Sequence, residues 1–234
     1  MTIVEQIQHL LSQCSEEQRR EVFELLRAQF PIHALEAQWN TTAEIILDAI
    51  TRSSDLTQRG VRGVIAEAAF KYNVIAALKG WTSEELRENY PYDFLLTDAV
   101  GQVRVQVKMQ RLKNHIPMTA NQGYRFLPGD MFVVETQRTR GGTDPQTHED
   151  TRPYRFGEFD ILAVSMHPST NNWSTFMYTV GDWLLARPGN PNLTLKFQPV
   201  PRIPNDVWTD QFTTVVGWFR SRARKKIVNL PASK

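Results

Sequence analysis

The chain has 234 residues, 41% of them hydrophobic, which is enough for one substantial domain with an ordinary core and an appendage. A single cysteine, Cys14, excludes an intrachain disulfide, and no apolar run approaches the roughly 20 residues of a membrane span. The net charge is only +2, but arginine and lysine gather over 104–113, 138–155 and 220–226, which indicates local basic patches. The N-terminal residues lack the basic-then-apolar order of a signal peptide, so we expect a cytoplasmic protein.

The first 57 residues have the spacing of amphipathic helices. Apolar residues recur at helical intervals from Ile3 to Leu11, and Ser15 with Gln18 forms a capping box ahead of a second helix. A third helix follows Thr41. We predict a helical subdomain over residues 1–57 that serves packing or dimerisation, or alternatively acts as an arm that contacts a ligand.

A longer helix is expected over residues 60–78. Gly60, Gly63 and Glu67 lie along one stripe of it, at spacings of three and four. Because glycine costs helix stability, two glycines in one turn indicate that another backbone approaches closely there. Glu67 would then lie beside that approach, although a solvated surface glutamate is the plainer interpretation.

Residues 103–110 alternate apolar and polar side chains without a break, which is the period of a half-buried strand. Residues 92–97 form a second strand-like run, and a glycine lies in the short connection, so the two predict a hairpin. If the turn is centred between residues 99 and 100, Asp93 lies directly across from Gln106, on the same face of the sheet.

The polar face of this hairpin is its most informative feature. Arg104, Gln106, Lys108 and Gln110 share it, and the register adds the carboxylate of Asp93. Since the valines of the other face suffice to hold the strand on a core, the polar row is expected to line a surface or a cleft. A carboxylate, an amide and an ammonium would then lie within a few ångströms of one another, which suits a metal-dependent phosphodiester site.

Further strands follow the hairpin. Residues 130–136 predict a third core strand, 159–164 a fourth and 176–180 a fifth, while the proline-rich stretch 188–204 is expected to be irregular. A last helix is expected from Asp206 onward. Its basic end, 220–226, is typical of a solvated helix C-terminus or, alternatively, of a phosphate contact.

The hairpin resembles the PD-(D/E)-x-K nuclease superfamily, which includes most type II restriction endonucleases. Two tripeptides carry the resemblance, Pro91-Tyr92-Asp93 and Gln106-Val107-Lys108. Tyr92 separates the proline from the acid, and Gln106 stands where the family ordinarily has its second acid. Some restriction endonucleases use Gln-x-Lys, so the resemblance still implies an active enzyme.

The resemblance implies catalytic roles for Asp93, Gln106, Lys108 and Glu67, the last matching a glutamate that the family often has on the helix before the hairpin. It implies Mg²⁺ as the cofactor, with Asp93, the Gln106 amide oxygen, the Val107 carbonyl and Glu67 as ligands. Lys108 would touch the scissile phosphate, orient the attacking water or stabilise developing charge.

Basic and amide side chains near the strand ends are the candidates for DNA binding. They are Arg104, Gln110, Arg111, Lys113, Asn114, Gln137, Arg138, Arg140, Arg152 and Arg155. Arginine can read guanine, and glutamine or asparagine can read adenine, through paired hydrogen bonds. Contact with phosphate alone is the alternative for any single arginine.

The sequence therefore predicts an α/β fold, with a restriction-endonuclease-like mixed central sheet flanked by helices over residues 58–234 and the helical subdomain before it. The expected function is that of a Mg²⁺-dependent type II restriction endonuclease of a prokaryotic cell, which cuts double-stranded DNA at a specific short site as a homodimer. A cognate DNA methyltransferase is expected in the same system. The alternatives are a homing endonuclease or junction resolvase of the same fold, and a catalytically inactive DNA-binding protein.

Overall fold

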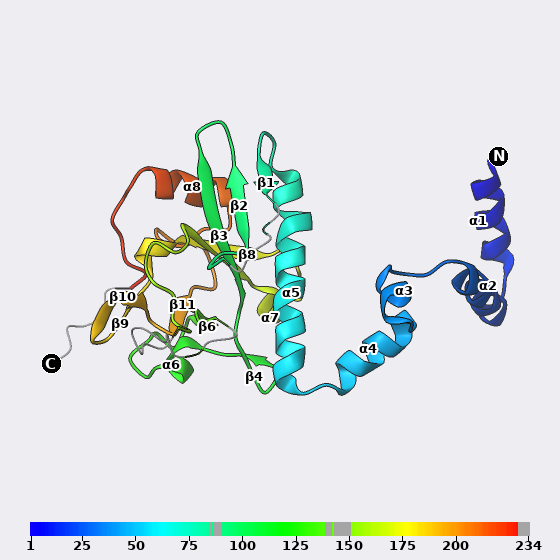
Figure 1. Ribbon diagram of the computed structural model, residues 1–234, viewed down its shortest axis with the longest axis horizontal. Coiled ribbons are helices and arrows are strands. Elements are labelled where there is room, and N and C mark those ends of the chain that lie inside the picture. The colour runs from blue at the N-terminus through cyan, green and yellow to red at the C-terminus, as the bar shows by residue number, and fades with distance from the viewer. Residues whose placement is uncertain (85, 87–89, 139–141, 143–150, 229–234) are drawn as a thin grey trace. The chain divides into compact units, whose positions relative to one another are not determined.

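The computed structural model describes residues 1–84, 86, 90–138, 142 and 151–228 (Figure 1). The chain divides into two compact units, Met1–Gln58 and Arg59–Lys234. Across the described part of the chain, no helix combines the length and the apolar character needed to cross a membrane.

The unit Met1–Gln58 is helical, as expected. It contains α1 (Ile3–Gln13), α2 (Glu16–Gln29), α3 (Leu35–Trp39) and α4 (Ala43–Arg52). Ser15 caps α2 in the predicted box with Gln18, whereas α4 begins one residue later than expected, with Thr42 as its cap. Arg27 of α2 binds both Glu36 and Glu44, so one guanidinium links α2, α3 and α4.

The long helices of this unit expose their apolar faces. None of α1, α2 and α4 carries a buried residue. Ile7 and Leu10 of α1 are 50% and 61% exposed, and Phe23 of α2 is 55% exposed. Helices of 10 to 14 residues gain most of their stability from packing an apolar face, and within this unit these faces remain uncovered.

The unit Arg59–Lys234 is built on a five-stranded mixed sheet, which confirms the predicted fold class. Its strands are β1 (Thr82–Glu84), β2 (Phe94–Thr97), β3 (Gln102–Met109), β7 (Ile161–Ser165) and β8 (Phe176–Val180), in the order β1-β2-β3-β7-β8. β3 and β7 are parallel, and the other neighbours are antiparallel. Figure 1 shows β2 and β3 as a tall hairpin beside α5.

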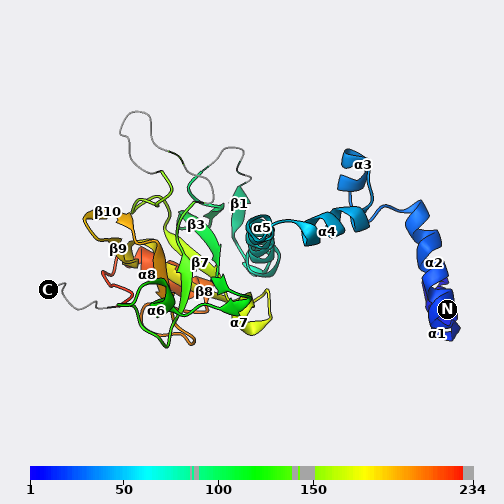
Figure 2. The ribbon, with the colours of Figure 1, turned by 90° about the horizontal axis from the view of Figure 1, so that it is seen from below.

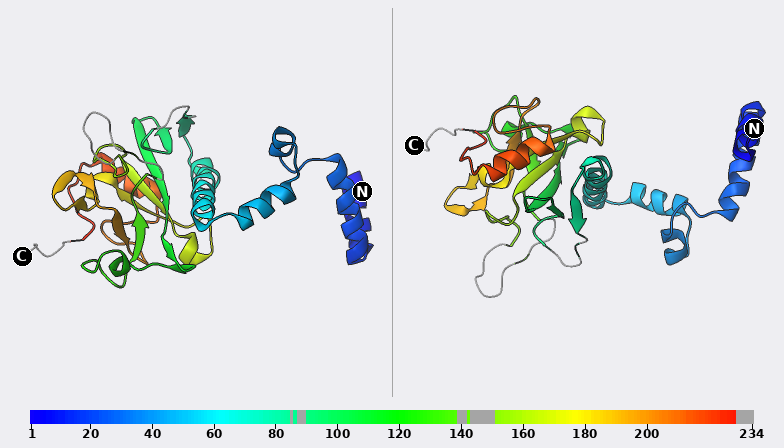
Figure 3. Two further views of the ribbon diagram at one scale, coloured as in Figure 1. Left: turned by 60° about the horizontal axis from the view of Figure 1, so that its bottom comes forward. Right: turned by 90° about the horizontal axis from the view of Figure 1, so that it is seen from above.

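Two helices flank this sheet, α5 (Asp55–Asn73) and α8 (Phe212–Arg220). Phe70 of α5 contacts Phe94 of β2 and Phe212 of α8, with ring centroids 5.4 and 5.8 Å apart. Both helices therefore pack on the face of the sheet that carries Phe94. Figure 2 views α5 almost along its axis beside the strands, and the right panel of Figure 3 shows α8 lying across them.

Smaller elements complete the unit. They are the 3-10 helices Ile75–Ala77 and Gly181–Trp183, the short helices α6 (Ala120–Gly123) and α7 (His167–Thr170), and the pairs β4 (Leu112–Lys113) with β5 (Ile116–Pro117), β6 (Phe132–Glu135) with β11 (Phe197–Val200), and β9 (Ala186–Arg187) with β10 (Asn190–Thr194). Between β6 and β7, the described residues include Thr151–Asp160, which lead into β7.

The predicted third core strand is present as β6, whose Val133 and Val134 are buried, but β6 pairs with β11, and β7 lies beside β3 in the central sheet. Two other expectations about the elements were wrong. The stretch 188–204 is only partly irregular, since it forms β10 and β11, with Pro191 in the first and Pro199 in the second.

The second error concerns the glycines of α5. A methyl group added at Gly60 or Gly63 would meet nothing within 4 Å. No described backbone approaches them, so the close approach inferred from their spacing is absent from this part of the structure. Helix α5 also begins earlier than predicted and ends at Asn73, short of the expected 78.

The register of the β2–β3 hairpin is as predicted. Phe94 lies across from Val105, and the same register places Asp93 across from Gln106. The Asp93 N–H donates to the Val105 carbonyl over 2.9 Å, which extends the ladder one residue before β2. At the other end, Arg220 of α8 forms two hydrogen bonds with the Asp98 carboxylate, of 2.7 and 2.8 Å, and so supports the turn.

Candidate active site

Asp93 is held at the start of β2 by the strand opposite. Its Oδ2 accepts the backbone N–H of Val107 over 2.7 Å and the side-chain Nε2 of Gln106 over 2.5 Å. Burial raises the pKa of the Asp93 carboxyl above its ordinary value, while the Lys108 charge and the Val107 N–H act in the opposite direction. The carboxylate is therefore fixed in position but poorly solvated, which favours the approach of a cation.

Gln106 is buried, with 2% of its surface exposed, and does not line an open surface as expected. The reason is that its neighbour in the sheet, β7, is buried along its whole length, so both faces of the sheet are covered there. The Gln106 Nε2 also donates to the Val107 carbonyl over 3.1 Å. One amide nitrogen thus bridges two of the predicted metal-binding oxygens.

Glu67 reaches this site from α5. It is half-buried, and its pKa is raised to about 7, first by burial and then by the negative charge of Asp93, while Lys108 lowers it. Burial and like charge both disfavour the ionised forms of these two carboxyl groups, and a divalent cation would offset both effects.

Lys108 lies next to Tyr154, a residue that the sequence did not single out. The Lys108 Nζ is 5.3 Å from the centre of the Tyr154 ring, and the Arg138 guanidinium is 5.6 Å from it. Tyr154 is only 4% exposed. No periodicity or motif in the sequence connects it to the hairpin 46 residues earlier, because its place depends on tertiary packing alone.

The donors present fit a hard divalent cation. Asp93 and Glu67 offer carboxylates, and the Val107 carbonyl and, after the amide turns over, the Gln106 Oε1 offer neutral oxygens. Within the described ranges, no cluster of three or more His, Cys, Asp or Glu side chains suits a metal ion, so a magnesium site here would depend on the amide and the carbonyl as well.

Gln110 and Arg104, two of the residues expected to bind DNA, are buried or paired within the protein, and Arg138 also forms an ion pair, with Glu158. Gln110 is completely buried, so it cannot reach a DNA groove, and that expectation is wrong. Arg104 contacts Asp160 with its Nη2 and Nε, at 2.6 and 3.1 Å, and the pair ties β3 to the start of β7. Its first role is to stabilise the sheet.

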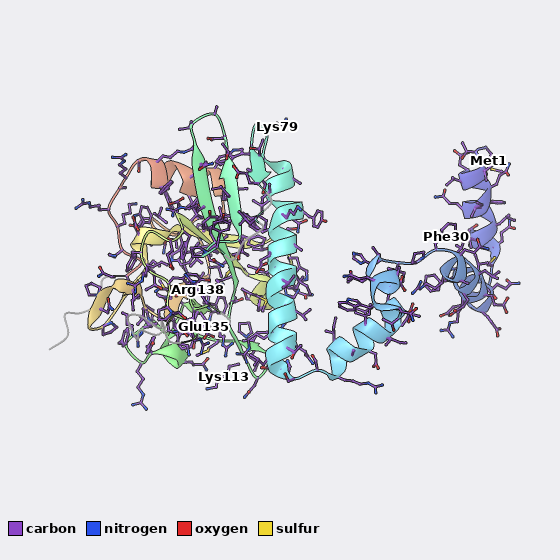
Figure 4. The ribbon with its side chains drawn as sticks, viewed as in Figure 1. Met1, Phe30, Lys79, Lys113, Glu135 and Arg138 are labelled. Carbon is purple, nitrogen blue, oxygen red and sulfur yellow. The ribbon has the colours of Figure 1, made fainter. Side chains whose placement is uncertain are left out.

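The other DNA-binding candidates lie nearer the surface. Lys113 and Asn114 are exposed at the tip of the β4–β5 hairpin, where Asn114 and His115 have positive φ angles of 52° and 62°. Figure 4 labels Lys113 there, and Arg138 just beyond β6. The Arg111 Nη1 lies 3.4 Å from the Glu135 Oε2, and Figure 4 also labels Glu135.

Four DNA-binding candidates remain. In the sequence, two of them follow β6 and the other two precede β7. Gln137 is half-buried and bridges to Pro153. Arg152 and Arg155 are exposed and lie on the segment that returns toward β7. Arg140 lies outside the described residues.

Comparison with known proteins adds little to this site. No protein-family model matches the chain, and no curated protein matches it. Among solved structures, the chain is similar to the bacterial homing endonuclease I-Ssp6803I, with 22% identity over 53% of this chain and 69% of that one. The TM-score of 0.34 is too low for that likeness to carry an argument, so the function has to be argued from the side chains of the site.

Proposed function

We propose that the protein is a Mg²⁺-dependent endonuclease that hydrolyses phosphodiester bonds in double-stranded DNA. The observation that carries the proposal is the convergence of Asp93, Gln106 and Lys108 on one face of the β2–β3 hairpin, with Glu67 approaching from α5. The pKa of about 7 for Glu67 supports it, because carboxyl groups shifted this far gather at functional sites.

Each residue has a distinct task in this proposal. Asp93, Glu67, the Val107 carbonyl and the Gln106 amide oxygen would hold the ion, which when bound neutralises charge and makes water nucleophilic. Lys108 would place its ammonium on the scissile phosphate and stabilise the charge that develops there. Glu67, a carboxyl group at the edge of this site, can also accept a proton from the attacking water.

The more specific form of the proposal is a type II restriction endonuclease that acts as a homodimer. Cutting both strands needs two sites, and a two-fold dimer suits a palindromic target. The exposed apolar faces of α1 and α2 support an assembly of chains. A cognate DNA methyltransferase would then protect the host DNA.

A cleavage assay tests the enzyme directly. With duplex DNA and Mg²⁺ we expect discrete fragments, and EDTA should abolish them. Asp93→Asn and Lys108→Met should each reduce cleavage by about 10³-fold or more, since each removes a charged group from the site. Asn is preferred to Ala at position 93 because Asp93 accepts two hydrogen bonds within the protein.

Lys79→Ala is the matched control, because Lys79 is an exposed lysine of the same unit that lies outside the site (Figure 4). Cleavage that persists in EDTA, or in the Asp93→Asn variant, would rule out the metal-dependent site. Binding of a specific duplex without cleavage in Mg²⁺ would identify an inactive DNA-binding protein. A long asymmetric target would indicate a homing endonuclease, and cleavage confined to branched junctions would indicate a resolvase.

A further inference from the structure

Tyr154 is surrounded by the charged groups of the site. The Lys108 Nζ and the Arg138 guanidinium lie 5.3 and 5.6 Å from its ring centre. Burial raises the pKa of its hydroxyl, the positive charge of Lys108 lowers it, and the Asp93 carboxylate raises it again. The phenol is therefore neutral at ordinary pH, and its ring lies beside Lys108 and Arg138.

The ring has little freedom to move. The Tyr154 carbonyl accepts the N–H of Thr194 over 2.8 Å, and its ring meets Phe159 edge-on, with the centroids 5.3 Å apart. One residue earlier, Pro153 bridges to Gln137. Because only 4% of its surface is exposed, Tyr154 has a fixed position beside the side chains of Lys108 and Arg138.

Arg138 is held in position next to the Tyr154 ring. Its N–H donates to the Arg152 carbonyl over 2.9 Å, and its Nη2 donates to Glu158 over 2.7 Å. Glu158 in turn accepts the N–H of Arg155 over 2.9 Å. Arg138 is thus held beside the Tyr154 ring through both its backbone and its side chain. Lys108, in contrast, reaches the same ring from β3 on a flexible four-carbon side chain.

We propose that Tyr154 is a positioning residue, which holds the Lys108 ammonium in the place where the scissile phosphate binds. This inference rests on the proposed nuclease function. An ammonium has three donors, so it can bond the Tyr154 hydroxyl and still offer others to a phosphate oxygen. Without the hydroxyl, the flexible lysine could fold onto the nearby carboxylates of Asp93 and Glu67, where it would compete with the metal ion.

The plainer alternative is that Tyr154 only fills the core. Tyr178 provides the matched control, because it is 3% exposed and packs among Phe70, Phe176 and Phe212. Tyr178→Phe removes a buried hydroxyl away from Lys108. If Tyr154 were only a core residue, Tyr154→Phe and Tyr178→Phe would have the same effect on cleavage.

The first experiment compares single-turnover cleavage in Mg²⁺ with duplex binding in Ca²⁺. We expect Tyr154→Phe to slow cleavage by roughly 10- to 100-fold, as misplaced catalytic groups do, and to leave the binding constant and thermal unfolding close to wild type. Tyr154→Leu, which also removes the ring, should be slower still. Equal cleavage by Tyr154→Phe and Tyr178→Phe, in an active enzyme that Lys108→Met inactivates, would overturn the proposal.

The second experiment does not depend on cleavage. Lysines of the folded protein are trace-labelled with an amine-reactive reagent, and the labelled peptides are quantified by mass spectrometry. In Tyr154→Phe and in Tyr154→Leu, we expect the rate at Lys108 to change several-fold relative to wild type, while Lys79 in the same samples keeps its rate. An unchanged Lys108 rate in both variants would refute the positioning role even if the protein cuts no DNA, whereas a changed rate without cleavage would count against the nuclease function alone.

Discussion

At the scale of single residues, the orientation of the Gln106 amide decides whether this side chain presents a donor or an acceptor to the proposed metal site. Its Nε2 faces the Asp93 carboxylate and the Val107 carbonyl, so the donor side of the amide lies where a cation would be held. Binding a metal ion through Oε1 requires the amide to turn over, which is a rotation of one side-chain bond. In the proposed site, the same amide would hydrogen-bond Asp93 and Val107 without metal and would bind the ion through its oxygen when the ion is present.

Substitutions at Gln106 test this idea. Gln106→Ala should lose most cleavage activity, roughly 100-fold or more, because it removes a ligand and leaves Asp93 without a donor. Gln106→Glu should keep part of the activity, since the nuclease family ordinarily has an acid there. Cleavage rates over a series of Mg²⁺ concentrations measure both effects.

Full activity of Gln106→Ala at every Mg²⁺ concentration would show that the amide takes no part in binding the ion. Gln102→Ala is the matched control, because Gln102 begins the same strand but is exposed.

Glu67 should make the stability of the protein depend on pH. Its folded pKa of about 7 exceeds the ordinary 4.5, so the folded state retains a proton that the unfolded state releases. The free energy of unfolding should therefore fall as pH rises from 4.5 to 7, by at most about 3 kcal/mol, and the loss should stop above 7.

Urea unfolding of wild type and Glu67→Gln across this pH range gives the measurement. We expect the variant to lack this part of the slope, so that its stability relative to wild type increases toward pH 7. Mg²⁺ should stabilise wild type more than the variant. Glu17→Gln, at an exposed position of α2, is the control, and parallel curves for wild type and Glu67→Gln would contradict the linkage.

At the scale of elements, no contact within the described chain explains why α5 has glycine at positions 60 and 63. Since a Cβ at Gly63 meets nothing within 4 Å, Gly63→Ala should raise the free energy of unfolding by about 0.5–1 kcal/mol, through the greater helix propensity of alanine. Gly217→Ala in α8 is matched, because it is also helical with open space around it.

The contrasting position is Gly181, where a Cβ would lie 2.6 Å from the Phe159 carbonyl oxygen. Gly181→Ala should therefore destabilise the protein, by about 1–3 kcal/mol. Thermal unfolding of the three variants checks both directions. If Gly63→Ala is stable but loses DNA binding, the helix stripe approaches a ligand that is absent from the structure.

At the scale of the whole molecule, we expect the proposed dimer to form through the helical unit. α1 has no buried residue and exposes Ile7 and Leu10, which suits a contact between chains. We expect the double substitution Ile7→Asp with Leu10→Asp, in the full chain, to convert a dimer into a monomer. Sedimentation equilibrium measures the mass.

Gln8→Asp adds a charge to the same helix at an exposed polar position, and the dimer should tolerate it. A monomeric wild type at micromolar concentration, or a dimer that survives both apolar substitutions, would place the contact between chains elsewhere or exclude it.

The sequence by itself determined what depends on local order along the chain. Alternation over 103–110 fixed the hairpin, and the short turn fixed Asp93 opposite Gln106, because register follows from turn length when one face must be buried. The capping box of Ser15 marked the start of α2 for the same local reason.

The tertiary structure alone decided which neighbours these residues meet. The parallel pairing of β3 with β7 buried Gln106 and Gln110, and it could not be read from β3, whose polar face looks solvent-exposed in isolation. Tyr154 reached Lys108 through contacts between residues far apart in sequence. Periodicity reports which side of a strand is apolar, but what covers the polar side depends on the rest of the chain, because that burial arises only when distant segments pack.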